Sequence, residues 1–282
     1  MTNSDGRRNQ GSCSGDDRRV RLFDITFTPG SAVEILSVAR DQSVTGPRLI
    51  VTANLDHIVT LSENVAFRKA YDRAVARTLD GMPLVWLARL SGATTARRVT
   101  GHDLVEAAFA EPWPAGQRIF LICASEIVGT RLTERLLAKG LPRHAIAVTV
   151  PPYGFEADEA YGTQLAAAVR AHGTTLLVFG VGAPRSEIWV DRQGEALGGP
   201  MVLAVGEALN VAAGLVPRAP VILQRAGLEW LFRFLNAPHR LFRRYFVRSW
   251  RLVGLVLRRF FVRHNPQRAT TASTPSGARD TP

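Results

Sequence analysis

The feature that most constrains the fold is a regular alternation of strand-like and helix-like segments in the middle of the chain. The strand-like segments are short apolar runs at 48–55, 118–124, 145–152, 174–182 and 201–206. Apolar residues at helical spacing occupy 63–79, 126–140 and 157–173. Gly140 suits the position just after a helix C-terminus. The alternation predicts an α/β fold whose mostly parallel sheet is covered by helices on both faces.

Ligands of such sheets bind where the strands end at their carboxyl termini. The segments expected to hold functional residues are therefore the loops that follow Asn54, Ala124, Pro151, Gly180 and Gly206.

Composition divides the chain into four parts. Residues 1–20 and 265–282 are polar and have little to bury, so we expect a disordered N-terminal arm and a disordered tail. Residues 21–216 hold the alternating pattern and are expected to form the α/β core. Residues 217–264 differ from both, because they hold most of the excess positive charge.

This basic segment accounts for nearly all of the net charge of +11. It contains eleven arginines and one acidic residue, Glu229, with aromatic residues between the arginines. On a helix, residues 240, 244, 248 and 251 share one face, and residues 241, 245, 252 and 256 share another. We therefore predict a basic amphipathic helical C-terminal appendage that lies on an anionic membrane surface.

Two alternatives exist for this segment. One is a helix packed on its own domain with a solvated basic face, although ordinary protein surfaces mix charges of both signs. The other is nucleic-acid binding. Large aliphatic residues on the opposite face favour lipid, so no nucleic acid is expected as a partner.

Several chemistries are disfavoured by what the sequence lacks. Cys13 and Cys123 are too few for a disulfide framework or a four-cysteine metal site, and Cys123 is expected to be a small buried side chain. The sequence lacks a P-loop, CxxC, HExxH, GxSxG and Asp-x-Asp. No metal or cofactor is therefore expected, and a bound diphosphate would need arginines as its countercharge.

The location is expected to be cytoplasmic and peripheral on the inner face of the cell membrane. The N-terminus has no apolar signal-peptide core, and no run reaches the roughly 18 apolar residues of a spanning helix. The sequence leaves homo-oligomerisation open.

Two candidate site segments come first in the chain. Thr52 and Asn54 end a predicted strand, where side chains open toward a substrate; the alternative for Asn54 is a turn residue bonded to the backbone. Asp80 and Gly81 precede an apolar run with Pro83, which indicates a strand-to-helix corner. The pattern alone favours Asp80 as the helix N-cap. The alternative is a general base that accepts a proton from a hydroxyl group.

A third segment contains Thr100 and Gly101 before a predicted helix, with Arg98 just upstream. Backbone N–H groups and the positive end of a helix suit a phosphate group there. The alternative is an ordinary N-cap with Asp103 as a first-turn acid. His102 is expected to lie exposed in a loop.

In the fourth segment, Gly180 and Gly182 follow a predicted strand and allow another group to approach the backbone closely. Their spacing does not complete a GxGxxG dinucleotide motif. Pro184 is expected to start a helix on which Glu187 and Trp189 lie.

Taken together, these segments resemble the WecG/TagA/CpsF glycosyltransferase family over roughly residues 22–262. The motifs that carry the resemblance occur in this order: TANLDHIV, LDGMPLVWLARLSG, RVTGHDL, PPYGF, VFGVGAPRSEIWV, AVGEALNVAAG, PRAP and GLEWLFRFLNAPHRLFRRY. The resemblance implies a Rossmann-like core without an added metal site and inversion at the anomeric carbon. It also implies a UDP-sugar donor, of the N-acetylmannosamine type or a related hexose. The implied acceptor is a polyprenyl-diphosphate-linked saccharide in bacterial cell-surface or exopolysaccharide biosynthesis.

The resemblance also implies roles for particular residues. Asp80 matches the catalytic base, and Thr52 and Asn54 match active-site residues beside it. Arg98 falls in the RVTG site motif, which also contains Thr100 and Gly101. The tail arginines Arg233, Arg240 and Arg243 match residues that close over the nucleotide diphosphate.

The sequence departs from the family pattern in two places. Gly182, Pro184 and Glu187 match a Gly-x-Pro-Lys/Arg-Gln-Glu motif, but Ser186 stands at its glutamine. Asn210 stands where the family has an aspartate near the nucleotide pocket. The first change bears on donor-sugar identity, because serine lacks the reach and bonding pattern of glutamine. The alternative function is a non-catalytic, membrane-associated member that binds a nucleotide-sugar or a partner protein.

Overall fold

A computed structural model describes residues 20–220, 222–223 and 227–236. The chain divides after Pro220 into two compact units, which are described separately. The first described residue, Val20, already lies in a strand.

The first unit is built on a six-stranded sheet in the order β4-β3-β8-β7-β5-β6. The strands are β3 (Arg48–Ala53), β4 (Ala76–Leu79), β5 (Ile119–Ile122), β6 (Ile146–Thr149), β7 (Leu176–Phe179) and β8 (Met201–Ala204). All five pairings between neighbours are parallel. The predicted Rossmann-like α/β fold is therefore confirmed.

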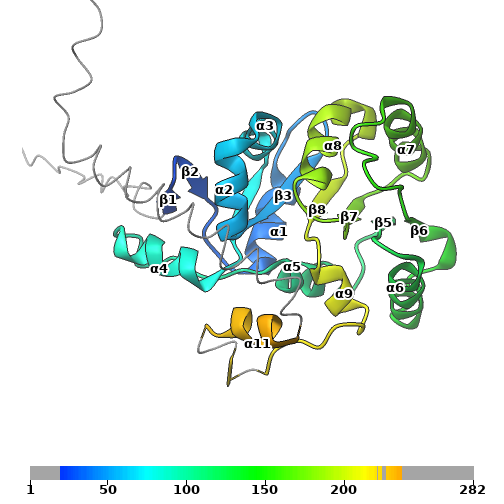
Figure 1. Ribbon diagram of the computed structural model, residues 1–282. Helices are drawn as coiled ribbons and strands as arrows, with labels where there is room; N and C mark the ends of the chain where they lie inside the picture. Colours follow the sequence, from blue (N-terminus) through cyan, green and yellow to red (C-terminus); the bar gives the residue numbers. More distant parts are fainter. Residues whose placement is uncertain (1–19, 221, 224–226, 237–282) are drawn as a thin grey trace, which may run out of the picture. The chain divides into compact units, whose positions relative to one another are not determined.

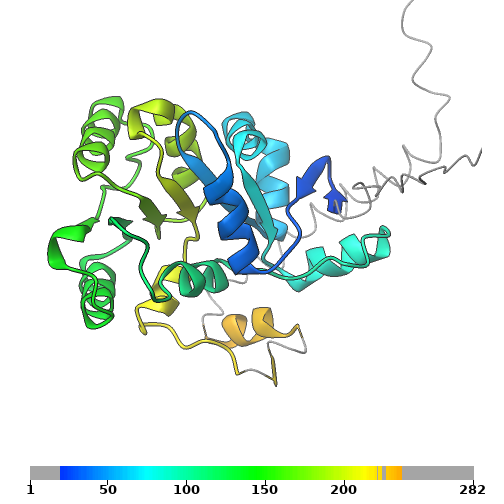
Figure 2. The same ribbon diagram turned by 180° about the vertical axis from the view of Figure 1, so that it is seen from behind.

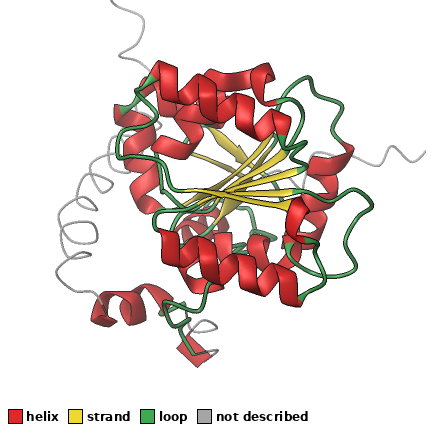
Figure 3. Cartoon of the chain, turned by 90° about the vertical axis from the view of Figure 1, so that its right-hand side faces the viewer, coloured by secondary structure: helices red, strands yellow, loops and turns green. Residues whose placement is uncertain are grey.

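Helices cover both faces of this sheet, which lies between two helical layers (Figure 3). One layer contains α2 (Leu55–Glu63), α3 (Val65–Arg73), α7 (Glu159–Ala171) and α8 (Arg185–Gln193). The other contains α1 (Ala32–Asp41), α5 (Gly101–Ala108), α6 (Glu126–Ala138) and α9 (Ala208–Ala212). Short 3-10 turns, η1 (Arg143–Ala145) and η2 (Gly194–Leu197), precede β6 and β8. After β3 the chain enters the first layer and after β8 the second, so the loops of these neighbouring strands diverge.

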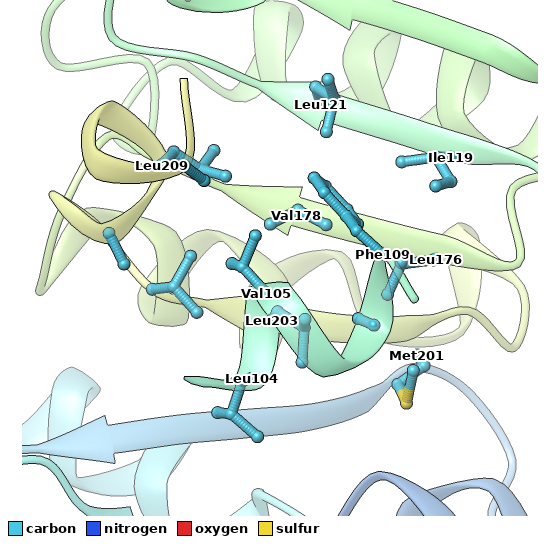
Figure 4. Close-up of a cluster of buried hydrophobic side chains, with 14 of the residues drawn as sticks. Leu104, Val105, Phe109, Ile119, Leu121, Leu176, Val178, Met201, Leu203 and Leu209 are labelled. Atoms are coloured by element: carbon cyan, nitrogen blue, oxygen red, sulfur yellow. The ribbon is translucent and has the colours of Figure 1, made fainter. Parts of the chain in front are cut away.

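Burial on both sides of the sheet explains the continuous apolar strands. In β7, Leu176 and Val178 belong to the core under α5, which Figure 4 shows around Phe109. The alternate residues Leu177 and Phe179 are equally buried. Strands that pack on both faces lose the polar alternation of half-exposed sheets, which is why they were recognisable as apolar runs.

Cys123, directly after β5, has no exposed surface and belongs to the same core. Burial raises the pKa of its thiol to about 12. The prediction of a small buried side chain is confirmed.

The prediction of one helix over 63–79 is wrong in its second half. Helix α3 ends at Arg73, and residues 76–79 form the edge strand β4 beside β3. Ala74 has an extended backbone, and the Val75 N–H donates to the Leu49 carbonyl, so the chain joins the sheet at once. The apolar spacing misled because a short buried strand and a helix end bury similar residues.

Several further elements were not predicted, among them α2, a hairpin and α1. Residues Val20–Leu22 and Ile25–Phe27 form the antiparallel hairpin β1–β2, with Phe23 and Asp24 at positive φ in its two-residue turn. Helix α1 begins at a capping box formed by Ser31 and Glu34.

The second unit is described only in part and contains α11 (Glu229–Asn236). Residues 237–264, including the two helical faces predicted from residue 240 onward, lie outside the described residues. In the part of the chain that the structure describes, no helix is long and apolar enough to cross a membrane.

Candidate active site

The first part of the candidate site lies where β3 and β4 end side by side. Thr52 pairs with Thr78 and Ala53 with Leu79, so Asn54 and Asp80 are the next residues of two adjacent strands. The Asp80 N–H donates to the Ala53 carbonyl at 2.8 Å, which extends the sheet pairing by one residue. The register thus brings together three residues that the sequence singled out: Thr52, Asn54 and Asp80.

Asn54 is the N-cap of α2, and its Oδ1 accepts the His57 N–H at 3.1 Å. The interpretation of Asn54 as a residue bonded to the backbone is therefore confirmed. Such a bond fixes the rotamer of the side chain and so holds the carboxamide beside the end of β4.

The prediction that Asp80 caps the following helix is wrong. The N-cap of α4 (Met82–Leu90) is Gly81, with no side-chain cap bond, and Pro83 occupies the first turn. Asp80 instead continues the backbone register of β4, which places the helix start one residue later. Asp80 is half-buried, and the general-base hypothesis for it stays a prediction.

The segment before α5 runs beside the end of β4. The Val99 N–H donates to the Leu79 carbonyl, and Thr78 Oγ1 donates to the Val99 carbonyl, each at 2.9 Å. These bonds carry Arg98 and Thr100 to the same edge of the sheet as Asp80.

Thr100 caps α5, as the alternative interpretation expected. Its Oγ1 accepts a hydrogen bond from the Asp103 N–H at 3.1 Å, and the Thr100 N–H donates to Asp103 Oδ2 at 3.0 Å. Burial acts to raise the pKa of Asp103, but its bonds to Thr100 and to Arg218, at 2.7 Å, outweigh burial and hold the pKa below its usual range. Gly101 is required for packing, because a Cβ there would lie 3.0 Å from the Val205 side chain.

The prediction for His102 is wrong. It lies in the first turn of α5 and is only 12% exposed. Burial, together with the charge of Arg218, lowers the pKa of its imidazole. Because α5 begins at Gly101, His102 lies inside the helix, one turn before Glu106, and not in an exposed loop.

The second part of the candidate site follows β7 and β8. Gly182 and Gly206 have positive φ values of 80° and 53°, and a Cβ on Gly206 would lie 3.4 Å from the Gly182 Cα. Helix α8 begins after Pro184 and carries Glu187, as predicted. Gly180 has a packing role, because a Cβ there would lie only 2.8 Å from the Leu209 side chain.

Ser186 and Glu187 are both buried, each 1% exposed. Ser186 Oγ donates to the Gly182 carbonyl at 3.4 Å. Glu187 Oε2 has no hydrogen-bond partner among the described residues, and burial raises the pKa of this carboxyl group to about 7. Burial of a carboxyl group with one oxygen unpaired costs free energy, so Glu187 is a candidate for a functional role.

Sequence reasoning missed a buried polar pair between these two parts. His57 Nδ1 and Tyr71 Oη lie 2.7 Å apart, and Tyr71 Oη donates to the Thr52 carbonyl at 3.4 Å. Burial raises the pKa of Tyr71 well above its usual value, and the charges of Glu187 and Asp80 add to this effect. Tyr71 is thus coupled electrostatically to both candidate carboxylates. Its helical spacing gave no signal beyond that of a core aromatic residue.

The other predicted residues are placed as follows. Arg233 lies in α11, but its side chain is not described, and Arg240 and Arg243 lie outside the described residues. Asn210 donates to Glu207 Oε1 at 3.1 Å on α9. Among the described residues, no group of three His, Cys, Asp or Glu residues is arranged to hold a metal ion.

A comparison with known families matches residues 20–266 of the 282. The matched span contains the whole parallel sheet and both parts of the candidate site. The order of the motifs, the Rossmann-like sheet and this match agree: the chain belongs to the glycosyl transferase WecG/TagA/CpsF family.

Proposed function

We propose that the protein is an inverting glycosyltransferase that does not require a metal ion. Its donor would be a UDP-sugar, of the N-acetylmannosamine type or a related hexose. Its acceptor would be a polyprenyl-diphosphate-linked saccharide used in cell-surface or exopolysaccharide biosynthesis. The observation that carries the proposal is the position of Asp80, beside Asn54 at the carboxyl edge of the sheet.

In this proposal, Asp80 accepts the proton of the acceptor hydroxyl as the oxygen attacks the anomeric carbon. The bond from that carbon to the UDP oxygen breaks on the opposite face, which inverts the configuration. Negative charge grows on the departing diphosphate, and cations that face it stabilise the transition state more than the bound substrate. The sequence offers Arg98 and the tail arginines Arg233, Arg240 and Arg243 for this role.

The nucleotide would bind where the loops of β3 and β8 diverge, as in other open parallel sheets. Gly206 follows β8 and lies close to Gly182, which follows the neighbouring strand β7. Burial raises the pKa of Glu187 to about 7, and in its protonated form this carboxyl group can donate a hydrogen bond to a sugar oxygen.

We further propose that residues 217–264 hold the enzyme to the cytoplasmic face of the membrane and complete the site through the arginines near their start. The test is Arg240→Gln in the full chain with a water-soluble acceptor, because a pure anchor would be dispensable there. We expect kcat to fall roughly a hundredfold, as for loss of one charge-stabilising donor. Arg268→Gln, in the C-terminal tail, is the matched control. Equal activity of the two variants would limit the segment to anchoring.

The function itself is tested by incubating the purified full chain with a panel of UDP-sugars and polyprenyl-diphosphate-linked acceptors. We expect release of UDP and a lipid-linked product whose mass increases by one sugar. Mass spectrometry of that product identifies the donor.

A non-catalytic role is the second candidate, and one observation favours it. The serine that replaces the motif's glutamine is buried and bonded to the Gly182 carbonyl, so Ser186 does not extend toward a substrate as a glutamine could. Tight binding of a UDP-sugar without turnover over the whole panel would support this candidate.

A further inference from the structure

Helix α4 presents an apolar face to solvent. Residues 83, 86, 87 and 90 follow helical spacing and form one side of the helix, here named the α4 stripe: Pro83, Trp86, Leu87 and Leu90. Trp86 is 44% exposed and Leu90 is 85% exposed. The opposite side of the helix is fully buried through Leu84, Val85 and Ala88. The helix is therefore apolar on both sides, although only one side faces the core.

The position of α4 makes this face accessible. The helix lies at the outer edge of the first unit beside β1, as both Figure 1 and Figure 2 show. A water-soluble surface helix normally carries polar residues on its outer face. A tryptophan and a leucine one turn apart on that face indicate a surface that binds something apolar.

The charges around the stripe favour a lipid surface over a protein. Residues 82–100 contain Arg89, Arg97 and Arg98 and no acidic residue. Arg89 is fixed at the helix end by a bond from its Nε to the Ala96 carbonyl at 3.1 Å. The adjoining hairpin carries one charge of each sign, Arg21 and Asp24, and the charge of Arg97 acts on Glu34, which leaves Arg89 as the cation on the helix itself. An apolar stripe with an arginine on the same helix matches the interface of an anionic bilayer.

A second copy of this chain is the less suitable occupant. The chain carries a net charge of +11, so two copies repel each other. Two basic, apolar faces in contact would also desolvate their arginines without supplying a countercharge.

The α4 stripe also begins close to Asp80, the proposed general base. Asp80 lies two residues before Met82, the first residue of the helix, and the bend at Gly81 is fixed by the register of β4. A helix that rests in the bilayer interface would hold Asp80 near the depth where the sugar of a lipid-linked acceptor is found.

We infer that the α4 stripe inserts its side chains into the interface of an anionic membrane, and that it does so separately from residues 217–264. Binding to the membrane does not depend on turnover. The benefit for the acceptor reaction rests on the proposed function.

The test measures co-sedimentation of the full chain with vesicles of phosphatidylcholine and phosphatidylglycerol. The variant W86E/L90E places two carboxylates on the stripe. The matched control V65E/L137E makes the same change in net charge at side chains that are 86% and 41% exposed and lie on α3 and α6. We expect the partition coefficient of W86E/L90E to fall about tenfold and that of the control to change by less than about twofold. Equal partitioning of the two variants would overturn the inference.

Two other possible occupants of the α4 stripe would be recognised by measuring the same proteins without lipid as well as with vesicles. If residues 237–264 cover the stripe, W86E/L90E lowers the thermal midpoint of the free protein and its vesicle binding equals that of the control. If a second copy covers it, the wild-type chain sediments as a dimer and the variant as a monomer, again with unchanged vesicle binding. Either result overturns the inference. We expect neither.

Turnover then separates this inference from the proposed function. With a membrane-embedded acceptor we expect W86E/L90E to react at least about tenfold more slowly than the control, and with a short-chain soluble acceptor at an equal rate. A wild-type chain that binds vesicles through the α4 stripe but transfers no sugar would contradict the proposed function alone.

Discussion

The two parts of the candidate site place their carboxylates in opposite environments. Where β3 and β4 end, Asp80 is half-buried beside Asn54 and lies two residues before Met82, the first residue of α4. After β7, Glu187 is 1% exposed on α8, and its Oε2 has no partner among the described residues. A half-buried carboxylate can contact a substrate group that arrives from solvent, whereas a fully buried carboxylate can contact only the groups packed against it. We therefore propose that the first part carries the acceptor chemistry and that the second recognises a bound sugar.

The strongest test of this comparison is Asp80→Asn. Loss of a general base lowers rates by about 10²- to 10⁴-fold, and we expect a loss of kcat in this range with an unchanged fold. UDP release in the presence of acceptor measures it. Asp72→Asn, an exposed carboxylate on α3, is the matched control and should retain full activity. Undiminished UDP release by the Asp80 variant would remove Asp80 from the mechanism.

Glu187→Gln tests the buried part through pH. In the folded state the carboxyl pKa is about 7, against 4.5 for an ordinary glutamate, so the folded protein holds a proton that the unfolded chain has lost between these values. The contribution of Glu187 to stability therefore falls as pH rises from about 4.5 to 7, by on the order of 3 kcal/mol. Glutamine does not titrate and lacks this loss.

Urea unfolding at pH 5 and pH 8 measures the difference between wild type and Glu187→Gln. Other carboxyl groups with lowered pKa values, such as Asp103 and Glu106, act in the opposite direction but are common to both proteins. We expect the variant to gain stability over the wild type as pH rises. A difference that stays constant with pH would show that Glu187 is not a strongly shifted group.

Asn54→Ala and Asn64→Ala form a matched pair of smaller effect. Each asparagine caps a helix of the same layer, through bonds to the His57 and Phe67 N–H groups at 3.1 and 2.9 Å. Both variants should lose about 1 kcal/mol of stability. Only the Asn54 variant should also lose turnover. If both variants lose turnover equally, the role of Asn54 is confined to capping.

The smallest effect on the pH profile is expected for Tyr71→Phe, which removes the hydroxyl between the two parts. The Tyr71 hydroxyl bonds to His57 Nδ1 and the Thr52 carbonyl, so its loss should cost about 1–2 kcal/mol of unfolding free energy. It should also lower the pKa of Glu187 very little, because the neutral hydroxyl carries no charge. A large change in the pH profile of Tyr71→Phe would instead place the hydroxyl in a proton pathway.

The sheet was predictable from sequence and the buried polar pair was not, for a physical reason. A strand such as β7 buries every residue, so its continuous apolar run between a helix and a glycine pair indicates it. For edge strand β4 the local pattern predicts the end of a helix, because the identity of this strand depends on pairing with β3, which no local pattern encodes. The distance between His57 and Tyr71 likewise depends on how α2 meets α3. Asp80 and Asn54 were found individually, but the structure was needed to show that one strand register joins them.

Because Cys123 is buried, a cysteine introduced elsewhere in the described part of the protein can be labelled selectively. The Cys123 thiol is inaccessible, and a pKa of about 12 leaves almost no thiolate to react at neutral pH. With Cys13 replaced by serine, a cysteine introduced at Leu90 would therefore be the reactive position of the chain. An environment-sensitive fluorophore attached there would report in real time whether α4 enters a bilayer, and how deeply.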